Sequence, residues 1–281
     1  MSREPRAVPV AVLSGWDLDA LEELTANVRA CAGRHRVVDV SDLEHPQPEA
    51  GVERLLVATQ EPARAAERVL ARQPDRTIAL DALVTVVDGS RAAVRLATDS
   101  PFSPSAAGFA QIALADCVVV TRTAELSDRG LDHVLWQIRG LNRFARIERL
   151  ADPTVGGCVL DVEAHTARAV RHRVLSVAPT LISECTAVPR TVCVGVEGRF
   201  DPDLLDGWLE WLGDEHEAEL FRWEGVFPLA DGDWTCTVAG IGASSSRTLN
   251  EMPTPLGRAL LVGRNLDAEV LEDSLRGALA E

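Results

Sequence analysis

The stretch VAVLSGWDLDALEEL, from Val10 to Leu24, decides the fold of the first half of this chain. Its apolar start predicts a buried strand, its Ser-Gly pair predicts a turn, and the residues that follow have helical spacing. Such a junction can bind phosphate, because the turn and the helix N-terminus offer free backbone N–H groups. We therefore expect Ser14, Gly15 and Trp16 to lie where a phosphate-binding loop would be.

The residues that would bind phosphate are missing from this turn. The pattern G-x-x-x-x-G-K-[ST] would need Ala20 to be Gly, Leu21 to be Lys and Glu22 to be Ser or Thr. The segment instead carries four carboxylates, Asp17, Asp19, Glu22 and Glu23. The sequence therefore predicts a nucleotide-binding scaffold whose phosphate loop is an inactive relic.

The composition excludes several functions. All 28 basic residues in the 281-residue chain are arginine, so no lysine can bind a phosphate, form a Schiff base or act as a general base. The net charge of −15 argues against an extended nucleic-acid groove. The densest basic patch, Arg168, Arg171 and Arg173, is either a solvated helix face or a local docking patch.

The sequence also indicates where the protein works. No apolar run approaches the roughly 18 residues of a membrane helix, and the N-terminus lacks an apolar signal core. We therefore expect a cytoplasmic protein without a membrane segment. Its six cysteines form no C-x-x-C pair, and we expect Cys117 and Cys236 to be small buried apolar residues.

Strands and helices alternate through the first half of the chain. The predicted strands are 8–13, 36–40, 53–59, 82–88 and 117–121, and the predicted helices are 19–32, 62–73, 105–115 and 128–142. This order predicts an α/β fold with a doubly wound, mainly parallel sheet of the P-loop NTPase type. We assign it to residues 1–185.

The last part of the chain has a different pattern, which predicts a smaller α+β domain over residues 186–281. The expected strands are 188–196, 221–229, 234–241 and 256–262, and the expected helices are 201–212 and 266–279. Its core is expected to be the aromatic cluster Trp208, Trp211, Phe221, Trp223, Phe227 and Trp234.

The order of several short motifs resembles the CobW-type branch of the metal-associated P-loop GTPases, a family that includes zinc metallochaperones. The family's T-G-F turn, L-D-G-V-V-T-V-V-D-A strand, Q-I-x-x-A-D helix end and L-N-P-x-A-x-I segment resemble residues 14–16, 83–88, 111–116 and 141–147. Its C-terminal domain resembles residues 200–201, 208–209, 220–225 and 261–267. The resemblance implies a GTPase scaffold with a role in metal homeostasis.

The chain departs from that family at each nucleotide motif. The guanine-reading N-K-x-D motif falls on residues 121–124, where Ala124 replaces the aspartate. The segment that senses magnesium and γ-phosphate corresponds to residues 58–62 and lacks its acidic residue and glycine. The C-x-C-C metal motif and the histidine-rich linker have no counterpart. We therefore expect no cofactor, with zinc as the one candidate metal.

Few residues could form a new metal site. The candidates are Cys158, His165 and His172, together with Asp161, and the two histidines are seven residues apart, which is the spacing of two helical turns. An exposed helix with two ordinary histidines explains the same spacing. A catalytic constellation is not visible.

Three functional hypotheses follow. The first is a non-catalytic CobW-like accessory protein in zinc homeostasis, without ordinary GTP binding or hydrolysis. The second is an interaction module that binds a protein partner or the ribosome, as in the ribosome remodelling linked to zinc limitation in some relatives. The third is an enzyme with a rebuilt pocket between the two domains.

Overall fold

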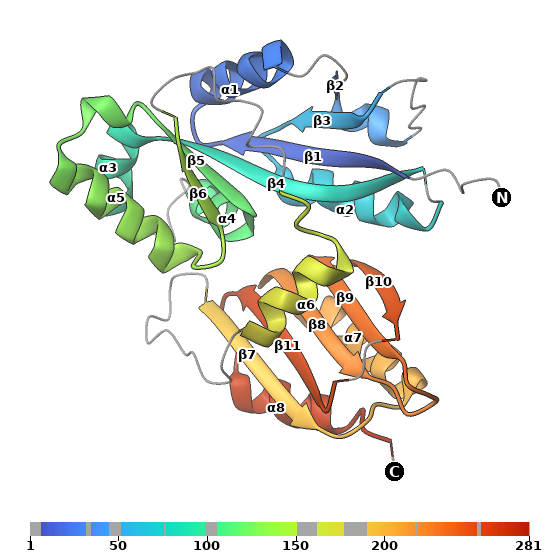
Figure 1. The fold of residues 1–281 in the computed structure, drawn as a ribbon. Coiled ribbons are helices and arrows are strands. Elements are labelled where there is room, and N and C mark those ends of the chain that lie inside the picture. Colours follow the sequence, from blue (N-terminus) through green and yellow to red (C-terminus); the bar gives the residue numbers. More distant parts are fainter. Residues whose placement is uncertain are drawn as a thin grey trace. The chain divides into compact units, whose positions relative to one another are not determined.

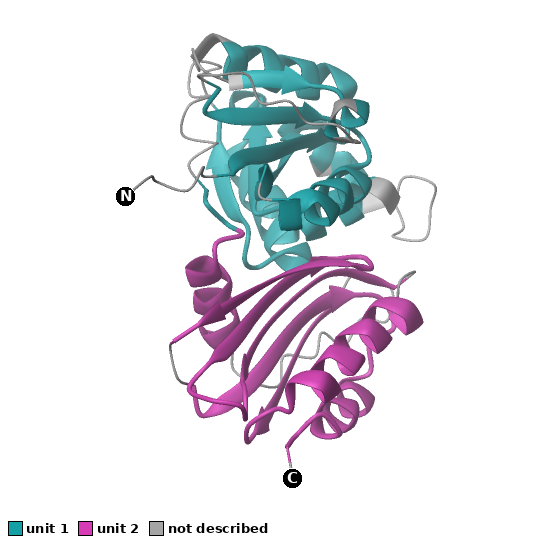
Figure 2. Cartoon of the chain, turned by 90° about the vertical axis from the view of Figure 1, so that its right-hand side faces the viewer, with its two compact units in different colours: residues 1–164 teal, residues 165–281 magenta. Residues whose placement is uncertain are grey.

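The computed structural model describes residues 7–31, 35–44, 52–75, 77–98, 106–150, 162–176, 190–216, 219–251 and 254–280. The chain forms two compact units, Met1–Ala164 (unit 1) and His165–Glu281 (unit 2), shown in Figure 2. The division precedes the predicted boundary at residues 185 and 186, because helix α6 (Ala167–Ser176) packs on the strands of unit 2. No helix of the described residues is long and apolar enough to cross a lipid bilayer.

Unit 1 is built on a six-stranded sheet in the order β2-β3-β1-β4-β5-β6, and every strand pair is parallel. Its strands are β1 (Val8–Gly15), β2 (His35–Val38), β3 (Arg54–Ala58), β4 (Ile78–Asp88), β5 (Cys117–Thr121) and β6 (Arg146–Arg149). Its helices are α1 (Leu18–Cys31), α2 (Pro62–Arg72), α3 (Gly89–Thr98), α4 (Ala106–Leu114) and α5 (Asp128–Leu141), with short 3₁₀ segments at Val40–Glu44, Gln73–Asp75 and Thr123–Glu125. The predicted parallel α/β fold is confirmed.

The central strands are buried on both faces. Helix α1 packs Leu21, Leu24 and Val28 against one face of β1 and β4, while α2 and α4 contact the same strands from the other side (Figure 1). Continuous apolar runs such as residues 117–120 suit strands covered on both faces. Cys117 and Cys236 are buried, at 0% and 5% exposure, as predicted.

One α-helix and one strand of unit 1 were not predicted. Helix α3 follows β4 without a loop, because Oδ1 of Asp88 accepts hydrogen bonds from the backbone N–H of Ser90 and of Arg91 and so satisfies the free donors of the first turn. The edge strand β6 has only four residues, and none of them is buried, so it lacks an apolar signal. Strand β4 also begins four residues earlier than its predicted start at Ala82.

Unit 2 is a five-stranded antiparallel sheet with helices on both faces. The strand order is β10-β9-β8-β11-β7, with strands β7 (Arg190–Glu197), β8 (Leu220–Pro228), β9 (Thr235–Ile241), β10 (Ser244–Asn250) and β11 (Leu256–Gly263). Helices α7 (Pro202–His216) and α8 (Ala268–Arg276) cover the face that carries the main apolar core, and α6 lies on the opposite face (Figures 1 and 2). Strand β10 was not predicted, because its sequence is mostly polar and none of its residues is buried.

The predicted aromatic core of unit 2 is only partly found. Trp208, Trp223 and Phe227 are buried in it, and Trp208 and Phe227 meet edge to face at 5.9 Å. Trp211 packs at its margin. Trp234 is 40% exposed and lies in the connection between β8 and β9, one residue before β9 begins.

Candidate functional site

The relic phosphate loop lies where the carboxyl ends of β1, β4 and β5 meet. In parallel sheets with helices on both faces, ligands bind at this edge, beside the turns that lead into the helices. Here the turn after β1 carries Trp16 and Asp17, the end of β4 carries Asp88, and the end of β5 carries Thr121 and Arg122.

Ser14 and Gly15 have structural roles at this edge. The hydroxyl groups of Ser14 and Thr85 are hydrogen bonded at 2.9 Å, and Thr85 donates to the carbonyl oxygen of Gln111 at 3.0 Å. A Cβ on Gly15 would lie 2.6 Å from Cγ1 of Val86, so only glycine lets β1 approach β4 this closely. Ser14 is 1% exposed and thus closed to solvent.

Trp16 packs over helix α4. Its indole forms an edge-to-face pair with Phe109 at 5.4 Å, and the guanidinium of Arg95 lies 5.9 Å from the indole centroid. A Cβ on Gly108 would fall 0.6 Å from Nε1 of Trp16, so the indole occupies the space that any other side chain would need. The indole of Trp16 is therefore held against α4.

Asp17 is bound by two arginines of helix α3. Its Oδ1 lies 2.9 Å from Nη1 of Arg91 and 3.2 Å from Nη1 of Arg95, and its side chain is 6% exposed. Hydrogen bonding to Asp17 raises the pKa of Arg91 above its usual value. At the start of α1, where a bound phosphate would receive positive charge, an internal carboxylate receives it instead.

A second ion pair joins β4 to the residue after β5. Nη1 of Arg122 lies 2.7 Å from Oδ2 of Asp88, whose side chain is 1% exposed. Burial alone would raise the pKa of Asp88, but hydrogen bonds from Ser90 and the backbone of Arg91, with the charge of Arg122, lower it below its usual value. Arg122 has φ 51°, the left-handed region, so its backbone is strained where it makes this pair.

The predicted base-recognition segment surrounds only a small pocket. Residues 121–124 line it together with Glu23, Leu24, Asn27 and Leu150, and its volume is about 130 Å³. Small-molecule sites commonly measure about 300–1,000 Å³. Ala124 adds no hydrogen-bonding side chain to this pocket, and Nη2 of Arg122 lies 4.0 Å from the carboxylate of Glu23.

These arginines were missed in the sequence. Arg91 and Arg95 belong to the unpredicted helix α3, and their spacing of four residues is a signal that could have indicated them, because it places both on one helix face. Three of the four carboxylates noted in the opening stretch have arginine neighbours. Asp19 lies 3.9 Å from Arg91, Glu23 lies 4.0 Å from Arg122, and Asp17 is bound as described.

In the part of the chain that the structure describes, the predicted metal ligands do not form a site. Cys158 and Asp161 lie outside the described residues. His165 lies before the start of α6 and His172 lies within it, so the spacing of two helical turns does not relate their side chains. Within the described ranges, no three His, Cys, Asp or Glu side chains form a group that could hold a metal ion.

Arg173 is not part of a solvated patch. It donates from Nε and Nη2 to the two carboxylate oxygens of Glu224, at 2.9 and 2.6 Å, and Arg222 donates to the same carboxylate at 2.6 Å. Burial alone would raise the pKa of Glu224, but the charges and hydrogen bonds of the two arginines lower it. Of the predicted patch, Arg168 is exposed and Arg171 is partly buried.

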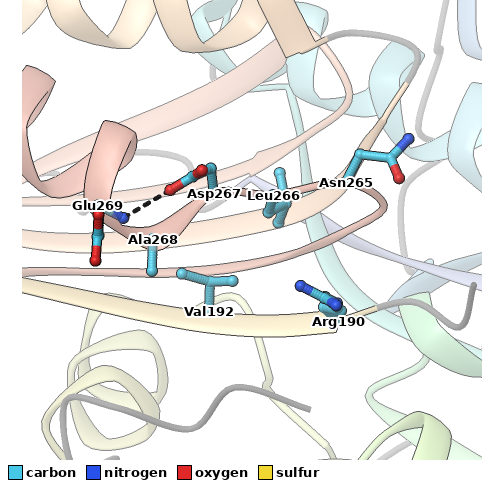
Figure 3. A pocket seen from close by; sticks show the side chains of 7 residues that line it. All are labelled: Arg190, Val192, Asn265, Leu266, Asp267, Ala268 and Glu269. Carbon is cyan, nitrogen blue, oxygen red and sulfur yellow. Dashed lines mark hydrogen bonds between the residues drawn. The ribbon is translucent and has the colours of Figure 1, made fainter. Parts of the chain in front are cut away.

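The larger groove lies on unit 2, between β7 and the start of α8. It measures about 390 Å³ and is lined by Arg190, Val192 and residues 265–269 (Figure 3). Oδ1 of Asp267 accepts hydrogen bonds from the backbone N–H of Glu269 and Val270, and Asn265 donates to Glu219 at 2.9 Å. Two of its polar side chains therefore cap and brace the chain itself, and no catalytic set converges on the groove.

The comparisons with known proteins agree with this architecture. Residues 190–279 match the family model of the cobalamin synthesis protein cobW C-terminal domain. The chain thus carries a CobW-type C-terminal region. The crystal structure of the Zn(II)-bound YjiA GTPase from E. coli superposes with a TM-score of 0.68 at 12% identity, covering 98% of this chain and 100% of that one. A Zn(II)-bound triple mutant of YjiA gives a TM-score of 0.66 at 12% identity, with the same coverage.

The likeness to YjiA extends over both units and shows that the two proteins share a fold. The parallel sheet of unit 1 and the antiparallel sheet of unit 2 both belong to it, so the fold predicted from the sequence is confirmed. The CobW match covers unit 2 from the start of β7 to just beyond α8.

Proposed function

We propose that this chain is a non-catalytic, CobW-like accessory protein that neither binds nor hydrolyses GTP in the ordinary way and that acts in cytoplasmic metal homeostasis. One observation carries the non-catalytic part. The buried carboxylate of Asp17 is bound by Arg91 and Arg95 at the turn where this fold would hold phosphate. To bind here, a phosphate would have to displace the Asp17 carboxylate from Arg91 and Arg95. The negative charge of the phosphate would then lie close to that of Asp17.

The surrounding residues support the same proposal. Leu21, in the position of the phosphate-binding lysine, is 5% exposed and packs in the core, so it contributes no charge to the site. Charged hydrogen bonds to phosphate are among the strongest that proteins make. Three arginines of the described residues at this edge, Arg91, Arg95 and Arg122, already pair with Asp17 and Asp88. The residues present therefore do not fit a nucleoside triphosphate with magnesium.

The metal role rests on the CobW-type C-terminal region and on the zinc-bound structures of YjiA. The described residues offer no ligand set for zinc, so they do not fit a resident ion in this part of the chain. An accessory role beside other metal-handling proteins does not require this chain to hold a zinc ion itself.

Titration with a fluorescent GTP analogue and magnesium tests the non-catalytic part, with YjiA as a positive control. We expect no saturable binding and no phosphate release above a heat-denatured sample. Binding with a micromolar dissociation constant would contradict the proposal. Elemental analysis of the purified protein tests the metal part, because stoichiometric zinc would identify a metal carrier, and its absence would fit an accessory role.

A second candidate is the protein- or ribosome-interaction module. It is favoured by Trp136, whose indole is 73% exposed on α5, since tryptophan is enriched in binding hot spots. Co-sedimentation with ribosomes at moderate salt tests the ribosome as a partner. Failure to sediment with them would leave the accessory role as the better explanation.

A further inference from the structure

Strand β10 forms one edge of the unit 2 sheet, beside β9 (Figure 1). The two strands pair without a bulge, from Ser244 opposite Ile241 to Asn250 opposite Thr235. An edge strand exposes a row of unpaired backbone groups, and proteins commonly protect such a row with a proline, a lysine or a bulge. β10 contains neither proline nor lysine, so its edge has none of these three protections.

The pairing with β9 decides which backbone groups of β10 point outward. The N–H of Gly242, just after β9, donates to the carbonyl oxygen of Phe221 in β8 at 3.3 Å. Successive residues of a central strand bond alternately to its two neighbours, so the odd-numbered residues of β9 bond to β10. Their partners in β10 are Ser244, Ser246, Thr248 and Asn250. The N–H and C=O groups of the residues between them, Ser245, Arg247 and Leu249, therefore point away from the sheet.

The outward groups of Ser245, Arg247 and Leu249 have no other backbone partner in the part of the chain that the structure describes. The side chain of Arg247 does not cross the edge, because its guanidinium forms an ion pair with Asp206 of α7. An extended peptide adds a strand to a sheet through such a row of outward backbone groups. The edge of β10 therefore fits a further strand.

Two exposed apolar side chains lie beside this edge. Leu249 is 59% exposed and lies opposite Cys236, which belongs to the core packed against α7 and α8. Trp234 is 40% exposed and comes two residues before Cys236, so it lies on the same face of the sheet. It is the diagonal neighbour of Leu249 across the strand pair, a spacing that large side chains bridge. Leu249 and Trp234 thus offer an apolar surface to a side chain of an added strand.

Carboxylates surround this apolar surface. The ion pair of Asp206 with Arg247 places the start of α7 beside β10, and the connection between β8 and β9 leads directly to Trp234. The exposed carboxylates of these segments and of the end of β10 are Asp203, Asp206, Asp231, Asp233 and Glu251. Arg247 pairs with Asp206, and Arg199 lies 3.6 Å from Asp233. Asp203, Asp231 and Glu251 have no ion pair within the described residues, so this surface favours a positively charged partner.

We propose that β10 is a docking edge for an extended, positively charged segment of another protein, which pairs with β10 as an additional strand. The outward backbone groups bind its main chain, Leu249 and Trp234 contact an apolar side chain, and the carboxylates bind lysine or arginine. A second copy of this chain fits less well, because it brings the same carboxylates to the same edge. The inference goes beyond the proposed function and depends on neither its nucleotide part nor its metal part.

Selection from a displayed library of random nine-residue peptides, on the immobilised full chain, tests the proposal. We expect the enriched peptides to contain lysine or arginine together with apolar residues in alternation. The most enriched peptide, synthesised with a fluorescent label, should bind with a micromolar Kd in anisotropy titrations. Raising NaCl from about 50 to about 500 mM should weaken this binding by about fivefold, because salt screens the carboxylates.

Leu249→Pro and Ser245→Pro block the edge without removing a hydrogen bond to β9. The N–H that proline lacks points outward at both positions, so both variants should keep the wild-type circular dichroism spectrum. Each should weaken peptide binding by about tenfold, which corresponds to the loss of one hydrogen bond. Leu249→Ala should weaken binding by about fivefold through lost apolar contact. Val270→Ala, at a position 53% exposed on α8, is its matched control and should leave binding unchanged.

The double variant Asp231→Asn with Glu251→Gln tests the role of charge. It should weaken peptide binding by about threefold, because two carboxylates beside the edge are lost. Asp128→Asn, at an exposed position on α5 of unit 1, is the control and should bind like the wild type.

Amide hydrogen exchange shows where the peptide binds. The outward amides of Ser245, Arg247 and Leu249 should exchange more slowly in the complex, while those of Ser246 and Thr248, already bonded to β9, should change little. Enrichment of no peptide, enrichment of acidic peptides, or equal binding to the wild type and both proline variants would overturn the proposal. Self-association of the chain alone that Leu249→Pro abolishes would assign the edge to a second copy and would equally overturn it.

Discussion

Nη1 of Arg91 lies 2.9 Å from Oδ1 of Asp17, although the two residues are 74 positions apart in the sequence. The pair joins the turn after β1 to helix α3 after β4, two neighbouring strands of one parallel sheet. The carboxylate of Asp17 thus lies where nucleotide-binding proteins of this fold bind the phosphate of the nucleotide.

Asp17→Ala should create an anion site. The substitution removes the carboxylate and leaves Arg91 and Arg95 facing the start of α1, where a helix N-terminus also favours negative charge. We expect millimolar pyrophosphate to raise the melting temperature of the variant and not that of the wild type. Differential scanning fluorimetry measures this shift.

Asp19→Ala is the control for this experiment. Oδ2 of Asp19 lies 3.9 Å from Arg91, and its side chain is 74% exposed, so its removal lowers the local negative charge without vacating the buried position. A pyrophosphate effect in Asp19→Ala as large as in Asp17→Ala would show that simple net charge, and not the buried carboxylate, blocks the site.

Gly108→Ala should destabilise unit 1 by about 2 kcal/mol, because its Cβ would overlap the indole of Trp16 and force it to move. Gly140→Ala, also in a helix, has no atom within 4 Å of its new Cβ. It should stabilise the protein by about 0.5–1 kcal/mol, since alanine is the better helix former. Urea denaturation compares the two, and equal effects would contradict the packing of Trp16 on α4.

Glu224→Gln should change how stability depends on pH. The pKa of Glu224 is lowered in the folded protein, so its stabilising contribution is present above its ordinary value of about 4.5 and is lost as the pH falls through the lowered value. The variant should therefore lose less stability than the wild type below pH 4.5. At pH 7 it should be about 3 kcal/mol less stable, because two arginines lose a buried partner.

Denaturation curves recorded between acid and neutral pH measure this effect. Glu210→Gln, an exposed position on α7, provides the control and should follow the wild-type pH profile. If Glu224→Gln also followed that profile, the ion pair with Arg173 would not be what stabilises the docking of α6.

The sequence allowed good predictions where the signal was local. The spacing of the residues after Gly15 predicted a helix, and Leu21, Leu24 and Val28 lie on the buried face of α1. The arginines could not be assigned in the same way. Arg173 stood in a basic run, but its partner Glu224 is 51 residues away and comes within reach only when α6 packs on β8.

The site depends on contacts between residues that are far apart in the sequence, and no local pattern predicts such contacts. Asp17 was recognised as a misplaced negative charge, but its partners lie on a helix that has no loop before it and was therefore not predicted. Only the parallel pairing of β1 with β4 brings the two ends together. A local motif can therefore show that phosphate chemistry is missing, and the tertiary structure is needed to show what replaces it.

Leu21→Lys should not restore nucleotide binding, although it replaces the residue in the lysine position. Leu21 is 5% exposed and packs among apolar residues of unit 1, so a charged ammonium there should cost about 3 kcal/mol of stability. The new charge would also meet a site whose arginines are already neutralised by Asp17 and Asp88. Leu18→Lys, at a position 57% exposed on the same helix, should change stability by less than about 0.5 kcal/mol. Chemical denaturation and titration with a fluorescent GTP analogue, performed on both variants, check these expectations. Micromolar GTP binding by Leu21→Lys alone would mean that one side chain, and not the internal ion pairs, separates this protein from an active GTPase.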